Sequence, residues 1–137
     1  MGRINAEILI ANNRDVVQLS TPDPVAGGVT HRVLAGVVDS GAARLVLPES
    51  IVDELGLIRD GETMVRYADH RRQRRDLVSN VWLQMLGRHG VFSAVVEPDR
   101  SDALIGAIVL EELDLLVDCP TQSVYPREPD TILTELE

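Results

Sequence analysis

Apolar and polar residues alternate along much of the chain with the period of β-strands. Helical spacing follows Pro48 and again Gly106, which predicts two brief helices, the first ending at Gly56 and the second near Leu113. Many short strands separated by turn residues indicate an all-β protein, expected to be a small, closed, mostly antiparallel β-barrel with one or two short helices. The predicted strands cover residues 3–10, 16–19, 29–38, 44–47, 62–67, 76–86, 91–96, 115–118 and 124–125.

Short polar segments predict how these strands are connected. The turn 12–15 joins the first two strands into a hairpin, and the turn 87–90 joins the strands on either side of it. The strands at 62–67 and 76–86 flank a polar tip, residues 68–75, which contains four arginines. We expect this tip to be a solvated hairpin end.

Length and composition fit one domain, since 137 residues that are 45% hydrophobic can bury a sizeable core. We place this domain at residues 1–127, followed by an acidic tail at 128–137. The tail holds four acids and no base, and is expected to form a weak helix or to be ordered only by a partner.

The charge balance excludes several classes of function. The net charge is −9, which argues against nucleic acid and anionic membrane surfaces as partners. The chain has no lysine, so lysine-based catalysis is excluded. Cys119 is its single cysteine, which fits a reducing compartment, and with no signal peptide or long apolar run we expect a cytoplasmic protein. The three histidines lack metal-ligand spacing, so we expect no metal and no cofactor.

One carboxylate follows a buried strand in the middle of this pattern. The apolar residues 35–38 lead directly to Asp39, and Ser40 and Gly41 form a turn before the next apolar run, 45–47. A carboxylate between two buried strands loses solvation, which is costly unless the group has a partner. Asp39 is therefore the first candidate for a catalytic residue.

Residues 39–42, Asp-Ser-Gly-Ala, resemble the catalytic Asp-Thr/Ser-Gly-Ala loop of the retropepsin-like aspartic proteases. Residues 103–118, in which Leu-Ile-Gly precedes a short helix and a strand, are similar to the second signature of the same family. The signatures occur in the expected order, about 65 residues apart. The resemblance spans residues 3–126, is to the small single-domain bacterial members, and implies the retropepsin type of barrel.

The resemblance implies catalytic and structural roles for five residues. Asp39 would act on the substrate through water, Ser40 would hold two aspartate loops together, and Gly41 would let the substrate backbone approach. Ile105 and Gly106 would form the structural second signature, in which a strand passes beneath the loop. No metal takes part in this chemistry.

Substrate binding is implied for residues of the loop and of the predicted hairpin. Ala42 and Ala43 belong to the loop, and Tyr67, Ala68 and Asp69 lie where the family has its flap, a lid over the substrate cleft. The chain departs from the family in two respects. Position 43 is alanine where many relatives have a polar residue, and no glycine lies between positions 61 and 87.

Aspartic proteolysis needs two carboxylates in contact, which share one proton. The chain has a single Asp-Ser/Thr-Gly sequence, at 39–41, so the resemblance implies that Asp39 of a second subunit completes the site. We expect a homodimeric aspartic endopeptidase that acts on extended peptide or protein substrates.

Two other interpretations remain open. The chain could be a catalytically silent, protease-like module for dimerisation or peptide binding, because a fold does not fix a function. Alternatively, the arginines at 71–75 could dock on an acidic partner or on the acidic tail.

Overall fold

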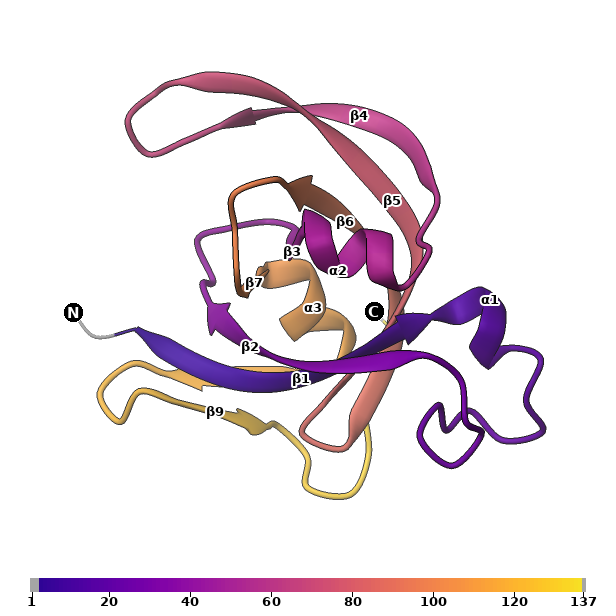
Figure 1. The fold of residues 1–137 in the computed structure, drawn as a ribbon. Coiled ribbons are helices and arrows are strands. Elements are labelled where there is room, and N and C mark those ends of the chain that lie inside the picture. The colour runs from indigo at the N-terminus through magenta and orange to yellow at the C-terminus, as the bar shows by residue number, and fades with distance from the viewer. Residues whose placement is uncertain (1–2, 137) are drawn as a thin grey trace.

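The computed structural model describes residues 3–136, which contain nine strands and three short helices (Figure 1). The helices are α1 (Asn13–Val16), α2 (Glu49–Glu54) and α3 (Ala107–Glu112). The strands are β1 (Ile4–Asn12), β2 (His31–Val38), β3 (Leu45–Pro48), β4 (Arg59–Arg66), β5 (Arg72–Met85), β6 (Arg88–Glu97), β7 (Ala103–Ile105), β8 (Leu115–Asp118) and β9 (Ser123–Pro126).

Six strands close into a barrel in the order β1-β2-β7-β3-β6-β5. The barrel closes because β1 pairs with β2 along one edge and with β5 along the other. Most neighbours are antiparallel, but β2 pairs in parallel with β7, and β3 in parallel with β6. The expectation of a small, closed, mostly antiparallel β-barrel is confirmed, with three short helices rather than one or two.

The interior of the barrel is aliphatic because alternate residues of each strand point inward. Ile8 and Ile10 of β1, and Leu45 and Leu47 of β3, are almost completely buried. Full burial of one such side chain contributes about 1.5–3 kcal/mol relative to an exposed position. This core fixes where each strand ends, and therefore where the connecting loops lie.

The long strand β5 changes its partner along its length. Residues 72–78 pair with β4, whereas residues 81–84 pair with β1. Between these parts the register against β6 shifts, and Asn80 has a positive φ of 62°. A bulge of this kind bends a strand. As a result β4 and the start of β5 form a hairpin that leaves the barrel and arches over one side of it (Figure 1).

The strand expected at 16–19 is wrong, because this part of the chain forms helix α1 and a turn. The side chain of Asn12 is buried and holds the helix start: its oxygen accepts from the N–H of Arg14, and its amide donates to the carbonyls of Leu55 and Gly56. Val16 then packs into a small second core. The expected hairpin between residues 3–10 and 16–19 is therefore absent from residues 3–136. β1 pairs with β2 and β5 instead.

The hairpin strands are longer than expected. Their pairing runs to Arg66 opposite Arg72, so the tip comprises only residues 67–71. Arg74 and Arg75, expected in a solvated tip, lie within β5.

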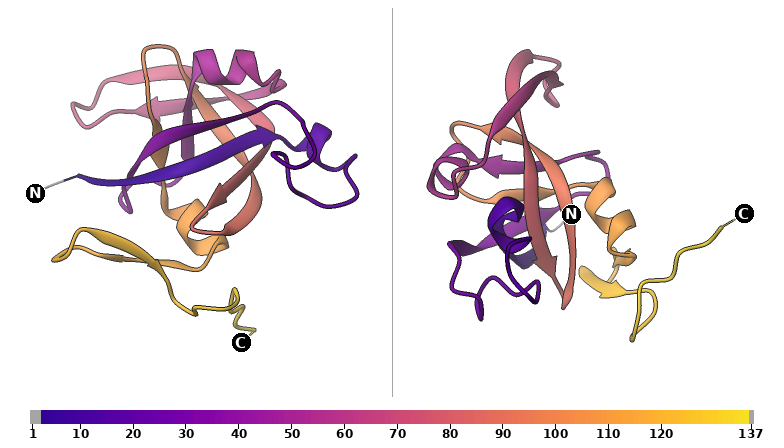
Figure 2. Two further views of the ribbon diagram at one scale, coloured as in Figure 1. Left: turned by 60° about the horizontal axis from the view of Figure 1, so that its bottom comes forward. Right: turned by 90° about the vertical axis from the view of Figure 1, so that its right-hand side faces the viewer.

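Strands β8 and β9 form a separate two-stranded sheet below the barrel, and the C-terminal segment continues from β9 (Figure 2). Residues 128–136 form no helix, which corrects one expectation for the tail. None of the helices in residues 3–136 is long and apolar enough to cross a membrane.

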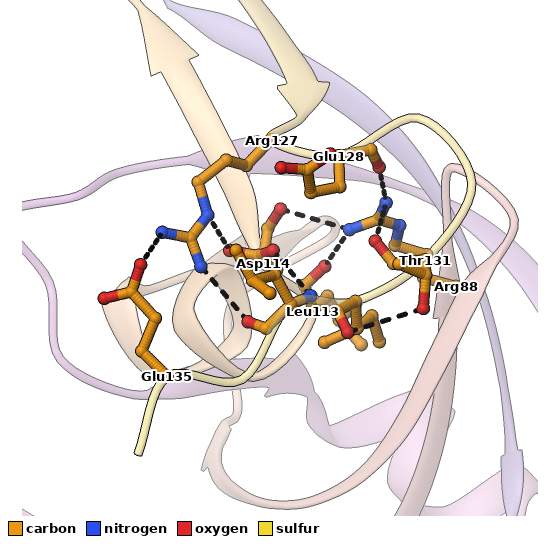
Figure 3. Close-up of polar contacts among 9 residues, drawn as sticks. Arg88, Leu113, Asp114, Arg127, Glu128, Thr131 and Glu135 are labelled. Carbon is orange, nitrogen blue, oxygen red and sulfur yellow. Dashed lines mark hydrogen bonds and ion pairs between the residues drawn. The ribbon is translucent and has the colours of Figure 1, made fainter. Parts of the chain in front are cut away.

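The tail is held by the domain itself rather than only by a partner. The guanidinium of Arg88 donates to the backbone carbonyls of Leu113 and Asp114 at the end of α3, and to those of Glu128 and Thr131 in the tail (Figure 3). One side chain of β6 thereby joins the end of α3 to the C-terminal segment.

Asp114 provides a second attachment for the tail. It is 9% exposed, and its two carboxylate oxygens have different partners. One lies 2.8 Å from Nε of Arg127, and the other accepts the N–H of Leu133 at 3.0 Å. Arg127 also contacts Glu135 and donates to the carbonyl of Leu133 (Figure 3).

Candidate active site

The loop that joins β2 to β3 presents Asp39 at the end of a buried strand. The N–H of Asp39 donates to the carbonyl of Ile105 at 3.0 Å, which ties the residue to β7. The N–H of Gly41 donates to Oδ1 of Asp39 at 2.9 Å, and the N–H of Ala42 donates to the carbonyl of Asp39 at 3.1 Å. These bonds fix both the backbone and the carboxylate. Asp39 is exposed in the single chain, so the expected loss of solvation does not arise from its own strands.

The segment after β7 supports this loop from below. The N–H groups of Ala107 and Ile108 donate to the carbonyls of Ala42 and Ala43, at 2.8 and 3.0 Å. Gly106 sits so close that a Cβ atom there would lie 2.8 Å from the carbonyl oxygen of Ala42. Such contact is shorter than real Cβ atoms make, so only glycine fits without movement of the backbone. The two sequence signatures therefore form one hydrogen-bonded unit.

A cleft of about 560 Å³ lies beside the loop. Its floor is apolar and consists of Val46, Val95 and Leu104, which lie on three neighbouring strands because Val46 pairs with both other residues. Six consecutive residues, 63–68, of β4 and the hairpin tip form the opposite wall. The hairpin thus covers a groove that ends at Asp39.

Three side chains tie the hairpin to the barrel beside this cleft. The hydroxyl of Tyr67 donates to Oε2 of Glu97 at 2.6 Å, and Nε of Arg75 lies 2.5 Å from Oε1 of the same carboxylate. The Arg75 and Glu97 side chains are 20% and 17% exposed, so water competes weakly for this ion pair. At the tip, the guanidinium of Arg71 lies 4.7 Å from the centre of the Tyr67 ring, within cation–π distance.

These contacts also favour the protonated forms of Tyr67 and Arg75. Burial raises the pKa of Tyr67, and the hydrogen bond to Glu97 raises it further. The hydrogen bond to Glu97 likewise raises the pKa of Arg75 above its usual range. At neutral pH the phenol is therefore a donor and the guanidinium a cation, which is the state that holds the hairpin.

A second groove, of about 280 Å³, lies on the other side of Asp39. Ser40 faces this groove, together with Val37 and Val38 of β2 and residues of β1 and of the β8–β9 turn, among them Cys119. Asp39 lines both grooves, whereas Ser40 lines only this one among the two. The loop therefore presents its aspartate to both grooves and its serine only to the second groove.

The cleft brings together six of the ten expected site residues, while Ser40, Asp69, Ile105 and Gly106 lie outside its lining. The cleft lining includes Asp39 with residues 41–43, and Tyr67 and Ala68 from the hairpin. Asp69 is not part of that lining. Its carboxylate instead accepts the N–H of Arg71 at 2.9 Å and so stabilises the turn of the tip.

Several cleft residues escaped the sequence reading. The floor residues lie on the outward face of their strands, where alternation usually places polar side chains. Val and Leu at these outward positions were the available signal. Arg75 was singled out only as part of the arginine run at 71–75, and its contact with Glu97 was not predicted because that contact depends on the arrangement of β5 and β6. Within residues 3–136, no group of three or more His, Cys, Asp or Glu side chains is arranged to hold a metal ion.

No protein-family model and no curated protein matches this chain.

Proposed function

We propose that the protein is an aspartic endopeptidase in which Asp39 from each of two subunits forms the catalytic pair. The observation that supports this proposal most is the hydrogen-bonded packing between the two sequence signatures. The Asp-Ser-Gly loop is held by Gly106 and the N–H groups after it, at the end of a cleft that a hairpin covers. Such rigid positioning is what a catalytic carboxylate needs.

In the proposed reaction the two Asp39 carboxyl groups share one proton, because like charges in contact cannot both ionise. The ionised group takes a proton from water, which attacks the carbonyl carbon of the peptide bond. The protonated group donates to the carbonyl oxygen and stabilises the negative charge that develops there. The tetrahedral intermediate then collapses with transfer of a proton to the leaving amine.

The second carboxylate must come from another copy of the chain. The only other carboxylate in the cleft lining, as far as residues 3–136 are described, is that of Glu97. Both oxygens of Glu97 are already engaged, by Tyr67 and Arg75, so it is unsuited to share a proton with Asp39. Asp39 and Ser40 are exposed in the single chain, which leaves room for a second subunit on a two-fold axis.

The covered cleft favours an extended peptide as the substrate. β4 lies at the end of the strand order, so its outer edge has no neighbouring strand in residues 3–136, and consecutive residues of this edge line the cleft. A free strand edge binds extended peptides through main-chain hydrogen bonds. The apolar floor would then accept side chains that point away from β4.

The decisive experiment compares the wild type with Asp39→Asn on a denatured protein mixture, at high protein concentration and from acid to neutral pH. New termini are read by mass spectrometry. We expect discrete cleavages, a bell-shaped dependence of rate on pH, and complete loss of both in Asp39→Asn. Asp130→Asn is the matched control, because Asp130 is an exposed tail residue remote from the cleft lining, and it should cleave as the wild type does.

Two results would contradict this proposal. Equal cleavage by wild type and Asp39→Asn would remove Asp39 from the chemistry. Absence of cleavage by a confirmed dimer would favour the alternative, a silent module that binds peptides, which the firm anchoring of the hairpin by Glu97 also allows.

A further inference from the structure

The charged residues of the cleft differ in whether they already have a partner. Glu97 is neutralised by Arg75, and Arg100 is bound to Asp102 at 3.1 Å. Arg44 also lines the cleft, yet its guanidinium has no hydrogen bond or ion pair with any residue in 3–136. Apart from Asp39, the uncompensated charge beside the floor is therefore positive.

Arg44 is the last residue of the loop that carries Asp39, and it lines the cleft together with the residues of the apolar floor. Arg44 immediately precedes β3, and both it and Val46 line the cleft, whereas Leu45 between them is completely buried in the core. Val46 is the centre of the floor, between Val95 and Leu104. A guanidinium from the same loop as Asp39 and an apolar surface thus line the same cleft.

The opposite wall adds positive charge. Arg66 lines the cleft from β4, and it lies directly opposite Arg72 in the antiparallel pair. Directly opposed like charges destabilise a strand pair. Neither arginine has a hydrogen bond or ion pair to an acid in residues 3–136, in a chain whose net charge is −9. An arriving carboxylate would relieve this repulsion.

We propose that the cleft selects peptides in which an acidic side chain lies close to an apolar one, and that Arg44 binds the acidic side chain. The apolar residue packs on Val46, Val95 and Leu104 while the carboxylate accepts hydrogen bonds from the Arg44 guanidinium, which can form a bidentate pair. Arg66 at the rim attracts the same peptides by its charge. This specificity rests on the proposed function, because it concerns the substrate of the same site.

The test uses synthetic peptides with a central leucine whose flanking positions carry glutamate, glutamine or lysine. Wild-type protein is assayed for cleavage, and Asp39→Asn is assayed for binding by fluorescence anisotropy of the labelled peptides. We expect glutamate to be preferred over glutamine about tenfold in both assays, as for a charge-assisted hydrogen bond. This preference should decrease as salt concentration rises.

Variants then assign the preference to one residue. Arg44→Gln should remove the preference for glutamate, and Arg44→Glu should replace it with a preference for lysine. Arg14→Gln is the control, because Arg14 is exposed on α1 and is not part of the cleft lining; it should behave as the wild type does. The same Arg44 substitutions are combined with Asp39→Asn for the binding assay.

The two assays separate the failure of this inference from that of the proposed function. Binding that prefers glutamate through Arg44, without cleavage by the wild type, would support the inference and remove the protease. Cleavage without preference for glutamate, a preference that survives Arg44→Gln, or the absence of binding to every peptide would overturn the inference.

Discussion

A Cβ atom on Gly106 would lie 2.4 Å from the carbonyl oxygen of Arg44, a separation at which something must move. The obstacle is backbone rather than the end of a flexible side chain. The same backbone segment carries Asp39 into the cleft. The position of the Asp39 carboxylate therefore depends on residue 106 having no side chain. The second signature is thus part of the site although it contributes no reactive group.

Replacement of Gly106 by alanine should therefore displace the Asp39 loop. We expect Gly106→Ala to lower the free energy of unfolding by about 1–3 kcal/mol, as for an overpacked interior, and to reduce cleavage far more than this loss would explain. Thermal unfolding and cleavage rates measure the two effects. Gly61→Ala is the matched control, since a Cβ at 61 would meet only Leu77 at an ordinary 3.8 Å. Full activity of Gly106→Ala would show that the packing between the two signatures is not needed.

The Tyr67 hydroxyl should hold the hairpin over the cleft. Tyr67→Phe keeps the ring beneath Arg71 but removes the donor to Glu97, and a hydrogen bond to a charged group contributes about 1.5–3 kcal/mol. Because water competes for the hydrogen bond at this partly exposed position, we expect the loss of stabilisation to lie at the lower end of this range. Amide exchange should accelerate in residues 63–75 while β1 and β2 remain protected. Equal acceleration of amide exchange across the whole barrel would contradict a local role of the Tyr67–Glu97 contact.

The same contact predicts a dependence on alkaline pH. The folded state raises the pKa of Tyr67, chiefly through burial, so it favours the protonated phenol. The stabilisation is then fully present below the ordinary tyrosine pKa of about 10 and is lost as the pH rises through the higher value in the folded protein. The protection of the hairpin amides against hydrogen exchange should thus stay constant from neutral pH to about 9 and fall above about 10. The absorbance of tyrosinate, taken as the difference between wild type and Tyr67→Phe, follows the titration itself.

Sequence periodicity was sufficient for the barrel but not for its pairing. The last residues of three strands, Val38, Glu97 and Asp118, were predicted to within one residue, because an apolar run stops there at turn residues. The segment after Asn12 was misread since Val16 and Val17 favour a strand locally. The buried Asn12 amide, which binds Leu55 and Gly56, overrides that preference, and contacts between such distant residues leave no local pattern.

The site shows the same limit. Asp39 and Gly106 could be selected from short sequence patterns, and Gly106 packs directly on the backbone of the loop that carries Asp39. Asp69 was chosen by its position in the hairpin, but its carboxylate turns to the N–H of Arg71. The partners of Glu97 could not be inferred, because Tyr67 and Arg75 reach it only when the hairpin folds back over β6.

The acidic tail should depend on Asp114. Asn at this position tolerates the positive φ of 56° and preserves the shape, but it loses the charge that faces Arg127 and one of the two acceptor oxygens. We expect Asp114→Asn to release residues 128–136, with faster amide exchange at Leu133 and a loss of about 1–3 kcal/mol from the buried contact. Asp118→Asn serves as the control on the neighbouring hairpin, where the carboxylate accepts only a weak 3.4 Å bond from Thr121. Unchanged exchange at Leu133 would show that Arg88, through its bonds to the carbonyls of the tail, holds this segment without Asp114.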